Sequence, residues 1–129
     1  MQFKPPPSST LQTSKYELIM QPVQFLKCLS DSTRLNCTLL IQEAGEICVC
    51  DLVTTLDESQ PKISRHLAQL RHCGLLTSIK REQWVFYSIN PKIPKWAKNI
   101  LKEIQKSNNP EILKLHSTLN SITNKANCC

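Results

Sequence analysis

Two cysteines separated by one residue, Cys48 and Cys50, are the side chains best suited to binding chemistry in this sequence. Thiolates bind soft, thiophilic ions, and the N-terminus of a helix favours a thiolate. In a regular helix, however, residues i and i+2 lie about 200° apart. Both sulfurs can therefore hold one ion only if Cys48 lies outside the helix that follows or if its first turn unwinds. The alternative is that both are small buried hydrophobic residues.

The other five cysteines are less informative. Cys28, Cys37 and Cys73 are expected within or at the ends of helices, and burial is the expected role of the first two. The adjacent Cys128 and Cys129 could be accessory ligands, targets of oxidation or neither. Seven cysteines, an odd number without the spacing of a disulfide framework, favour thiols that are free, metal-binding or redox-active over structural bridges.

The composition excludes several classes of function. The 129 residues are about one domain's worth. Gly45 and Gly74 are its two glycines, too few for a glycine-rich phosphate or dinucleotide loop. No run approaches the roughly 18 apolar residues that cross a bilayer, so we expect a cytoplasmic protein without membrane contact. The net charge of +6 predicts a polyanionic partner.

Apolar residues at helical spacing predict four helices in the first part of the chain. The second runs from an N-cap at 30–32 to Gly45, the third covers about 49–56, and the fourth runs from a cap at Ser59 to Gly74. The first begins near Tyr16, with Pro22 in its first turn or kinking it. These helices position the cysteine pair at the start of the third.

The period then changes from 3.6 to 2 residues, which predicts a small antiparallel hairpin. Its strands are expected at 75–79 and 84–89 and its turn at 80–83. Beyond Pro91 and Pro94, two further helices are predicted, one carrying Trp96 and Leu101 on its apolar face and one starting near 109–111. The expected fold is mainly α with a small β-hairpin.

Charge is unevenly distributed along the chain. Five acids and no base lie between Arg34 and Lys62, whereas ten bases and two acids lie in 62–106. Two short helices joined by a tight turn, the second basic and well capped, followed by a hairpin with a basic tip, are typical of a winged helix-turn-helix. A helix fits the DNA major groove, and the hairpin can reach the flanking backbone. The alternative is an ordinary solvated face.

The candidate DNA contacts share the exposed side of the fourth helix or the hairpin tip, and are Ser59, Gln60, Lys62, Ser64, Arg65, Gln69, Lys80, Arg81 and Gln83. Arg65 and Gln69 can read base edges, whereas Lys62 and Ser64 can hold phosphate. Ser59 and Gln60 lie at the helix end that usually enters the groove. His66 lies about 60° from the apolar stripe, so packing or bonding to the backbone is as plausible for it as a DNA contact.

Several stretches in this order resemble the arsenic-responsive repressors of the ArsR/SmtB family: 31–35, 46–52, 59–67, 84–87 and 93–96. The resemblance implies a homodimer joined through its first and fifth helices, which binds a palindromic operator in double-stranded DNA without a cofactor. It also implies release when arsenite or antimonite, as trivalent arsenic or antimony, binds a site that includes Cys48 and Cys50. Three consecutive prolines at 5–7 predict that 1–15 is a disordered leader. We expect 16–106 to be the winged helix-turn-helix DNA-binding and dimerisation domain, and 107–129 a C-terminal helix and cysteine-ending tail.

At one important position the sequence departs from these repressors. They carry a cysteine three residues after the second cysteine, whereas this chain has Val53. A three-sulfur site would need a third thiol, for which Cys128 or Cys129, from the same or the partner chain, is the candidate. Alternatively, the site has two ligands and is weak, or the response is lost. Glu82 also occupies a place where the wing turn often has glycine.

Three functions remain open from the sequence. The first is a DNA-binding repressor controlled by trivalent arsenic or antimony. The second is a constitutive or thiol-redox-responsive winged-helix repressor without a metal site. The third is a thiol-disulfide oxidoreductase using Cys48 and Cys50, which is disfavoured because nothing else indicates a redox fold. We therefore expect no enzyme and assign no catalytic residue.

Overall fold

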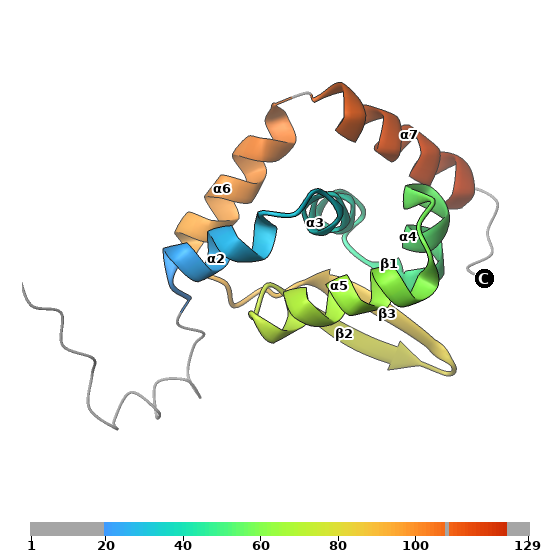
Figure 1. Cartoon of the computed structure of the whole chain (residues 1–129), viewed down its shortest axis with the longest axis horizontal. Helices are drawn as coiled ribbons and strands as arrows, with labels where there is room; N and C mark the ends of the chain where they lie inside the picture. Colours follow the sequence, from blue (N-terminus) through green and yellow to red (C-terminus); the bar gives the residue numbers. More distant parts are fainter. Residues whose placement is uncertain (1–19, 108, 124–129) are drawn as a thin grey trace, which may run out of the picture.

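The computed structural model describes residues 20–107 and 109–123. Its elements are, in order, α2 (Pro22–Leu29), α3 (Ser32–Ala44), β1 (Ile47–Cys48), α4 (Val49–Leu56), α5 (Gln60–His72), β2 (Leu76–Arg81), β3 (Trp84–Ile89), α6 (Lys95–Lys106) and α7 (Pro110–Thr123). Helix α3 runs through the middle, with α5 and the sheet on one side and α6 and α7 on the other (Figure 1). The predicted leader, the expected helix start at Tyr16, and Cys128 and Cys129 lie outside the described residues.

The helix ends follow from local signals in the sequence. Asp31 caps α3, because its carboxylate accepts a hydrogen bond of 3.0 Å from the backbone N–H of Arg34. Ser59 caps α5 in the same way through the N–H of Lys62. Gly45 and Gly74 have φ values of 85° and 89°, which favour glycine. The predicted limits of these two helices are thus confirmed.

The hairpin is confirmed, but its turn is shorter than predicted. The strands β2 and β3 pair from Leu76 opposite Ile89 to Arg81 opposite Trp84, so the turn contains two residues and not four. A two-residue turn needs positive φ, and Glu82 supplies it with φ of 58°. Lys80 and Arg81, which were expected in the turn, therefore belong to β2 and pair with β3.

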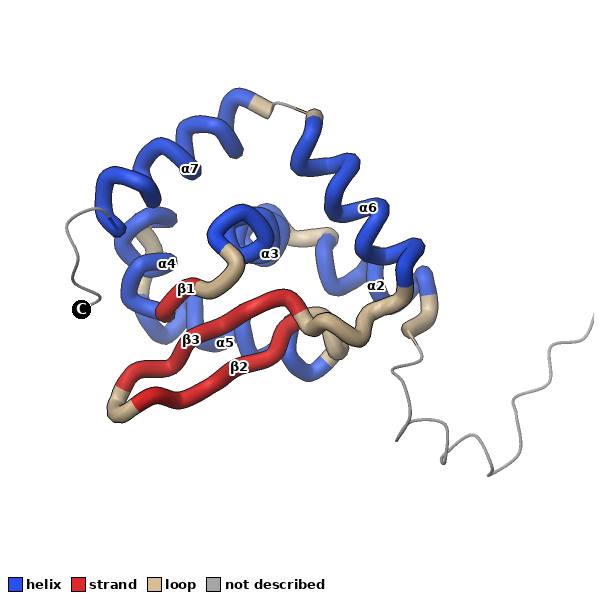
Figure 2. Tube along the Cα trace, turned by 180° about the vertical axis from the view of Figure 1, so that it is seen from behind, coloured by secondary structure: helices blue, strands red, loops and turns tan. Residues whose placement is uncertain are grey.

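A third strand, β1, was not predicted. It pairs antiparallel with β3, giving the order β1-β3-β2 (Figure 2). Cys48 lies opposite Phe86 in this pairing. Two residues are too few to show an alternating pattern, so only the tertiary structure reveals that the cysteine pair adjoins the wing.

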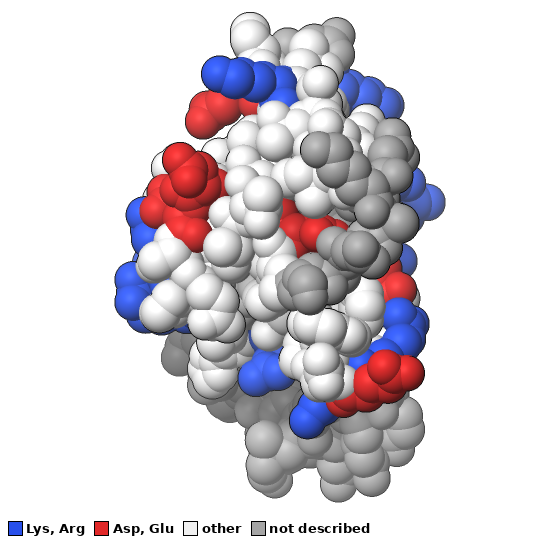
Figure 3. All heavy atoms as spheres, turned by 90° about the vertical axis from the view of Figure 1, so that its right-hand side faces the viewer, with Lys and Arg blue, Asp and Glu red and all other residues white. Residues whose placement is uncertain are grey.

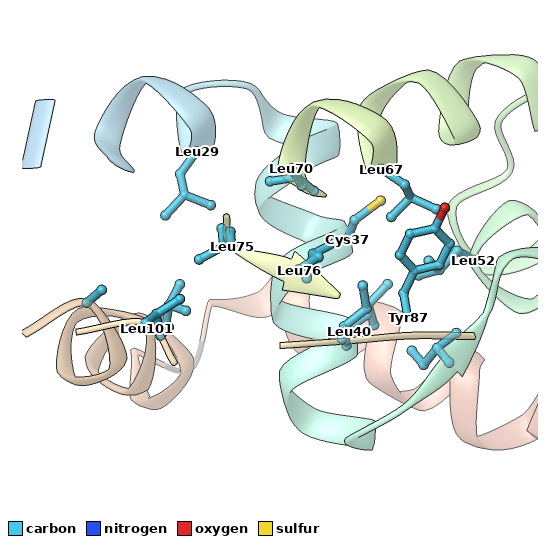
Figure 4. Close-up of a cluster of buried hydrophobic side chains, with 14 of the residues drawn as sticks. Leu29, Cys37, Leu40, Leu52, Leu67, Leu70, Leu75, Leu76, Tyr87 and Leu101 are labelled. Atoms are coloured by element: carbon cyan, nitrogen blue, oxygen red, sulfur yellow. The ribbon is translucent and has the colours of Figure 1, made fainter. Parts of the chain in front are cut away.

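The core lies between α3, α5 and the sheet (Figure 4). The predicted apolar stripe of α5, Ile63, Leu67 and Leu70, is fully buried. Burying such a side chain contributes about 1.5–3 kcal/mol. Cys37 is also fully buried, and burial raises the pKa of its thiol to about 12. Its predicted role as a small hydrophobic residue is confirmed.

The last two helices complete the core. Helix α6 buries Ala97 and Leu101, and helix α7 packs against α3 and α4 with Ile112 and Leu119 buried. In the described part of the chain, no helix is long and apolar enough to cross a membrane. Helices α6 and α7 lie on the opposite side of α3 from α5 and the hairpin of β2 and β3 (Figure 1).

Candidate DNA interface and thiol site

The predicted DNA contacts on α5 differ in exposure and in partners. Ser59, Gln60 and Arg65 are exposed, whereas Lys62 and Ser64 are half-buried. Lys62 forms an ion pair of 3.0 Å with Glu58. Because this pair lies at the surface, it is worth at most about 1 kcal/mol. A phosphate could therefore draw Lys62 away from Glu58, while Arg65 is already directed to solvent.

The end of α5 is anchored by Arg34 of α3, a role that its sequence context did not predict. Its guanidinium donates to the side-chain oxygen of Gln69 at 2.9 Å and to the backbone oxygen of Cys28 at 2.7 Å. It also lies 3.3 Å from Nδ1 of His66. Gln69, although exposed, is thus held in place, and a base edge would compete with Arg34 for its oxygen. An arginine in a helix N-terminal turn gives no sequence signal for such a tertiary contact.

His66 is buried and faces the scaffold. Its Nε2 lies 3.9 Å from the Asp31 carboxylate, and its relative exposure is 8%. The backbone hydrogen bond from Arg34 is the main cause that lowers the pKa of Asp31, and the charges of His66 and Arg34 act in the same direction. Of the two roles open for His66 in the sequence, packing fits this environment.

The wing tip carries two exposed candidates, Lys80 and Gln83, and one that is paired. Arg81 forms an ion pair of 2.8 Å with Glu46 and lies over the Phe86 ring at 5.0 Å. Its hydrogen bond to Glu46 raises the pKa of Arg81. A neighbouring carboxylate reduces the attraction of this arginine for phosphate, so Lys80 is the stronger electrostatic contact at the tip.

Basic side chains also line an open groove of about 690 Å³ between α2 and α5. Its lining consists of Gln24, Lys27, Cys28, Arg34, Arg65, Ala68, Gln69, Arg71, His72 and Cys73. Arg71, which was not among the predicted contacts, donates a hydrogen bond of 3.1 Å to Ser78 and so joins α5 to β2. By contrast, the face in Figure 3 intersperses acidic and basic side chains and is not continuously basic.

The structure meets the geometric condition for a shared site at the cysteine pair. Cys48 is the N-cap of α4 with extended backbone, φ −84° and ψ 154°, so it lies outside the helix that carries Cys50. Cys48 is buried and Cys50 half-buried. Both are disulfide-bonded in this structure. Because the thiolate is the form that binds a metal, reduction must precede binding of an ion.

The described residues do not complete such a site. Among them, no group of three His, Cys, Asp or Glu side chains is placed to hold a metal ion. Val53, one helical turn beyond Cys50, is a partly buried residue that packs against the core. Asp51, in the first turn of α4, has a pKa raised by burial. The other two predicted ligands, Cys128 and Cys129, are outside the described residues.

Cys28 and Cys73 form a disulfide, although the sequence favoured free, metal-binding or redox-active thiols over structural bridges. The disulfide joins α2 to the C-cap of α5, and both residues are half-buried. The expected burial of Cys28 is therefore only partial. The two cysteines are 45 residues apart in sequence, and their Cα atoms lie 6.9 Å apart. Nothing local in the sequence signals this pairing, because helix packing brings the two residues together.

A capped basic helix, packed on a shorter helix and followed by a strand pair with a basic tip, defines a winged helix-turn-helix DNA-binding protein. Residues 31–78 match the family model described as "Bacterial regulatory protein, arsR family". The chain is 57% identical over 82 residues to the arsenical resistance operon repressor of Escherichia coli K12, covering 64% of this chain and 70% of that protein. This chain belongs to the arsR family, whose members are transcriptional regulators and not enzymes.

Further comparisons agree with this assignment. The chain is 47% identical over 103 residues to the arsenic resistance transcriptional regulator ArsR1 of Pseudomonas putida KT2440, covering 77% of this chain and 80% of that protein. Reduced HlyU from Vibrio cholerae N16961 has a similar structure, with TM-score 0.60, 26% identity and coverage of 76% of this chain and 95% of HlyU. The AntR antimony-specific transcriptional repressor shares the fold at TM-score 0.55 and 18% identity, covering 77% of this chain and 81% of AntR.

Proposed function

We propose that this chain is a cytoplasmic, homodimeric repressor that leaves its operator when trivalent arsenic or antimony binds through Cys48 and Cys50. The observation that carries this proposal is the position of Cys48 as the N-cap of α4, because it removes the 200° separation that a regular helix would impose. The names of the two relatives, an arsenical resistance operon repressor and an arsenic resistance regulator, favour arsenic as the inducer.

DNA binding follows from the exposed side of α5 and the wing. We expect α5 to enter the major groove with Arg65 at base edges, and Lys80 and Gln83 to contact the flanking backbone. Ser59, Gln60, Lys62, Ser64 and Gln69 are further candidates on α5, and Arg81 on the wing. No cofactor is needed for these contacts.

A dimer would place two such helices on a palindromic operator, with half-sites about 34–36 Å apart. The first helix of the structure supports this proposal. Val23 and Leu26 on α2 are 65% and 56% exposed, although both are large and apolar. Phe25 of the same helix contacts Trp96 of α6 with the rings 5.3 Å apart, so α2 and α6 form one unit. A second copy could cover this surface.

The proposed arsenic site needs a third thiolate besides Cys48 and Cys50. A pyramidal As(III) centre takes three sulfurs, and Val53 cannot supply one. We propose Cys128 or Cys129 as the third ligand, from the same or the partner chain. Both lie outside the described residues.

The sensor adjoins the wing through β1. Cys48 pairs with Phe86 of β3, and Glu46, just before β1, forms an ion pair with Arg81 of β2. An ion that draws the sulfurs of Cys48 and Cys50 together would therefore pull on the strand beside the wing. For release, the ion must bind the DNA-free conformation better than the operator-bound one, by about 1–3 kcal/mol.

The test is an arsenite titration of the reduced full-length protein on a duplex that the protein itself selects from a random library. We expect release of the wild type and no release of Cys50→Ser at equal DNA affinity. The double variant Cys128→Ser/Cys129→Ser should need much more arsenite. Cys37→Ala, which removes a buried thiol, is the matched control. Release of Cys50→Ser at the wild-type arsenite concentration would contradict the proposal.

A further inference from the structure

We propose that Cys28 and Cys73 form a reversible dithiol-disulfide site, open to small thiols that carry carboxylates, and that its oxidation fixes the end of the recognition helix α5. This site is separate from the Cys48 and Cys50 pair and does not depend on arsenic. Its two cysteines come from different parts of the fold, α2 and the C-cap of α5.

Access to the disulfide is the first step. Both cysteines are half-buried and both line the open groove between α2 and α5. Cys37 shows the contrast, because it is fully buried and its thiol has a pKa raised to about 12. A reagent in solution can therefore reach Cys28 and Cys73 but not Cys37.

The groove also selects the charge of the reagent. Lys27, Arg34, Arg65, Arg71 and His72 lie in its lining together with the disulfide. Such a basic lining attracts a thiol that carries carboxylates, and cationic side chains stabilise the thiolate, which is the reactive form of a cysteine. The chemical class that fits is a small anionic thiol or its disulfide.

The exchange needs no further reactant. The thiolate of one small thiol attacks a sulfur of the Cys28–Cys73 bond, which breaks, and the other sulfur leaves with the electron pair and takes up a proton. A second small thiol attacks the mixed disulfide and releases the remaining cysteine. Two small thiols are oxidised to their disulfide as the protein disulfide is reduced to two thiols, and the reverse reaction oxidises the protein.

The effect of reducing this disulfide depends on the other contacts that connect α2 and α5. Arg34 donates to the backbone oxygen of Cys28 and to the side chain of Gln69, so hydrogen bonds and the disulfide connect the same two helices. Reduction removes the covalent link, so the end of α5 is then held by the hydrogen bonds of Arg34 and Arg71 and by its buried apolar stripe. A helix already fixed loses less conformational freedom on binding DNA. The oxidised protein should therefore bind its operator more tightly.

The first experiment follows the bond itself in the full-length protein. Trypsin cleavage after Lys27, Arg34, Arg71 and Lys80 places Cys28 in peptide 28–34 and Cys73 in peptide 72–80, whereas Cys37, Cys48 and Cys50 share peptide 35–62. After equilibration in glutathione and glutathione disulfide at a series of ratios, acid quenching and alkylation, mass spectrometry counts the linked pair. We expect it to change from fully linked to fully reduced across the series, through a glutathione adduct on one of the two peptides. A pair that stays linked, or never links, would overturn the proposal.

The preference of the groove for anionic thiols is tested by the salt dependence of the reduction rate. The rate of reduction by glutathione should fall more steeply with added salt than that by 2-mercaptoethanol, because the attacking thiolate of 2-mercaptoethanol carries no carboxylate. Equal salt dependence of the two reagents would refute the role of the basic groove.

The second experiment measures affinity for the selected duplex without arsenic. Oxidised wild type should bind about three to ten times more tightly than reduced wild type, in line with the cost of ordering a few side chains. Cys28→Ser and Cys73→Ser should lose this difference, while Cys37→Ala keeps it. Equal or weaker binding by the oxidised wild type, or an undiminished difference in both serine variants, would overturn the proposal. A negative result in this experiment would not contradict the proposed release by arsenite, because affinity is measured without arsenic. The two proposals are therefore tested separately.

Discussion

The guanidinium of Arg34 in α3 donates a hydrogen bond of 2.9 Å to the side-chain oxygen of Gln69 on α5. The same group donates to the backbone oxygen of Cys28 in α2. One half-buried side chain thus connects the recognition helix to the two helices behind it. The position of α5 depends on this contact as well as on its buried apolar stripe.

Replacement of Arg34 by alanine should therefore destabilise the protein. We expect the free energy of unfolding to fall by about 1–3 kcal/mol, because partly buried acceptors lose a charged donor. Urea denaturation measures this change. Arg71→Ala is the control, since its hydrogen bond to Ser78 is exposed and should cost less than about 0.5 kcal/mol. Equal losses for the two variants would refute the anchoring role of Arg34.

Arg65→Ala and Lys80→Ala should weaken DNA binding in different ways. Arg65→Ala should cost about 1–3 kcal/mol and relax base preference, because the arginine is expected at a base edge. Lys80→Ala should weaken binding equally for all sequences and reduce the salt slope by about 1. Gel-shift titrations at several salt concentrations separate the two effects. Lys114→Ala, on α7, should change neither, and unchanged affinity of both test variants would exclude this docking.

Val53→Cys should strengthen the arsenic response. Val53 lies one helical turn beyond Cys50 in α4, so a thiol there lies on the same side of the helix. We expect the reduced variant to leave DNA at lower arsenite concentration than the wild type, even when Cys128 and Cys129 are replaced by serine. Leu56→Cys adds a half-buried thiol six residues after Cys50, about 120° around the helix from it. If Leu56→Cys gained as much, the geometric explanation would fail.

The pH dependence of stability should change on replacement of Asp31. Its pKa in the folded state is lowered, mainly by the backbone hydrogen bond from Arg34. The ionised carboxylate therefore stabilises the fold above its unfolded pKa of about 4, and this contribution is lost as the pH falls through the lower folded value. Asp31→Asn keeps a good helix cap but does not titrate. Wild type should lose stability relative to Asp31→Asn as the pH falls below about 4.

Urea denaturation at several pH values measures this difference, with Asp31→Ala as the second variant. Because alanine is a poor cap, Asp31→Ala should lose about 1 kcal/mol at neutral pH. Parallel pH profiles for wild type and Asp31→Asn would show that Asp31 acts only as a cap.

Local signals in the sequence determined the helices, their caps and the wing. Asp31, Ser59, Gly45 and Gly74 fix helix ends through bonds or backbone angles within a few residues, so their effect can be predicted without the fold. The apolar stripe of α5 likewise follows from spacing alone. The same regularity predicted that both sulfurs can meet only if Cys48 lies outside the helix or the first turn unwinds, and the structure shows the first of these.

The tertiary structure alone decided which distant residues meet. The strand β1, the hold of Arg34 on Gln69, the pairing of Arg81 with Glu46 and the bridge from Cys28 to Cys73 all join parts of the chain more than 30 residues apart. Such contacts depend on how helices and strands pack around α3. A periodic pattern reports which side of an element is buried, but not which side chain of another element will face it.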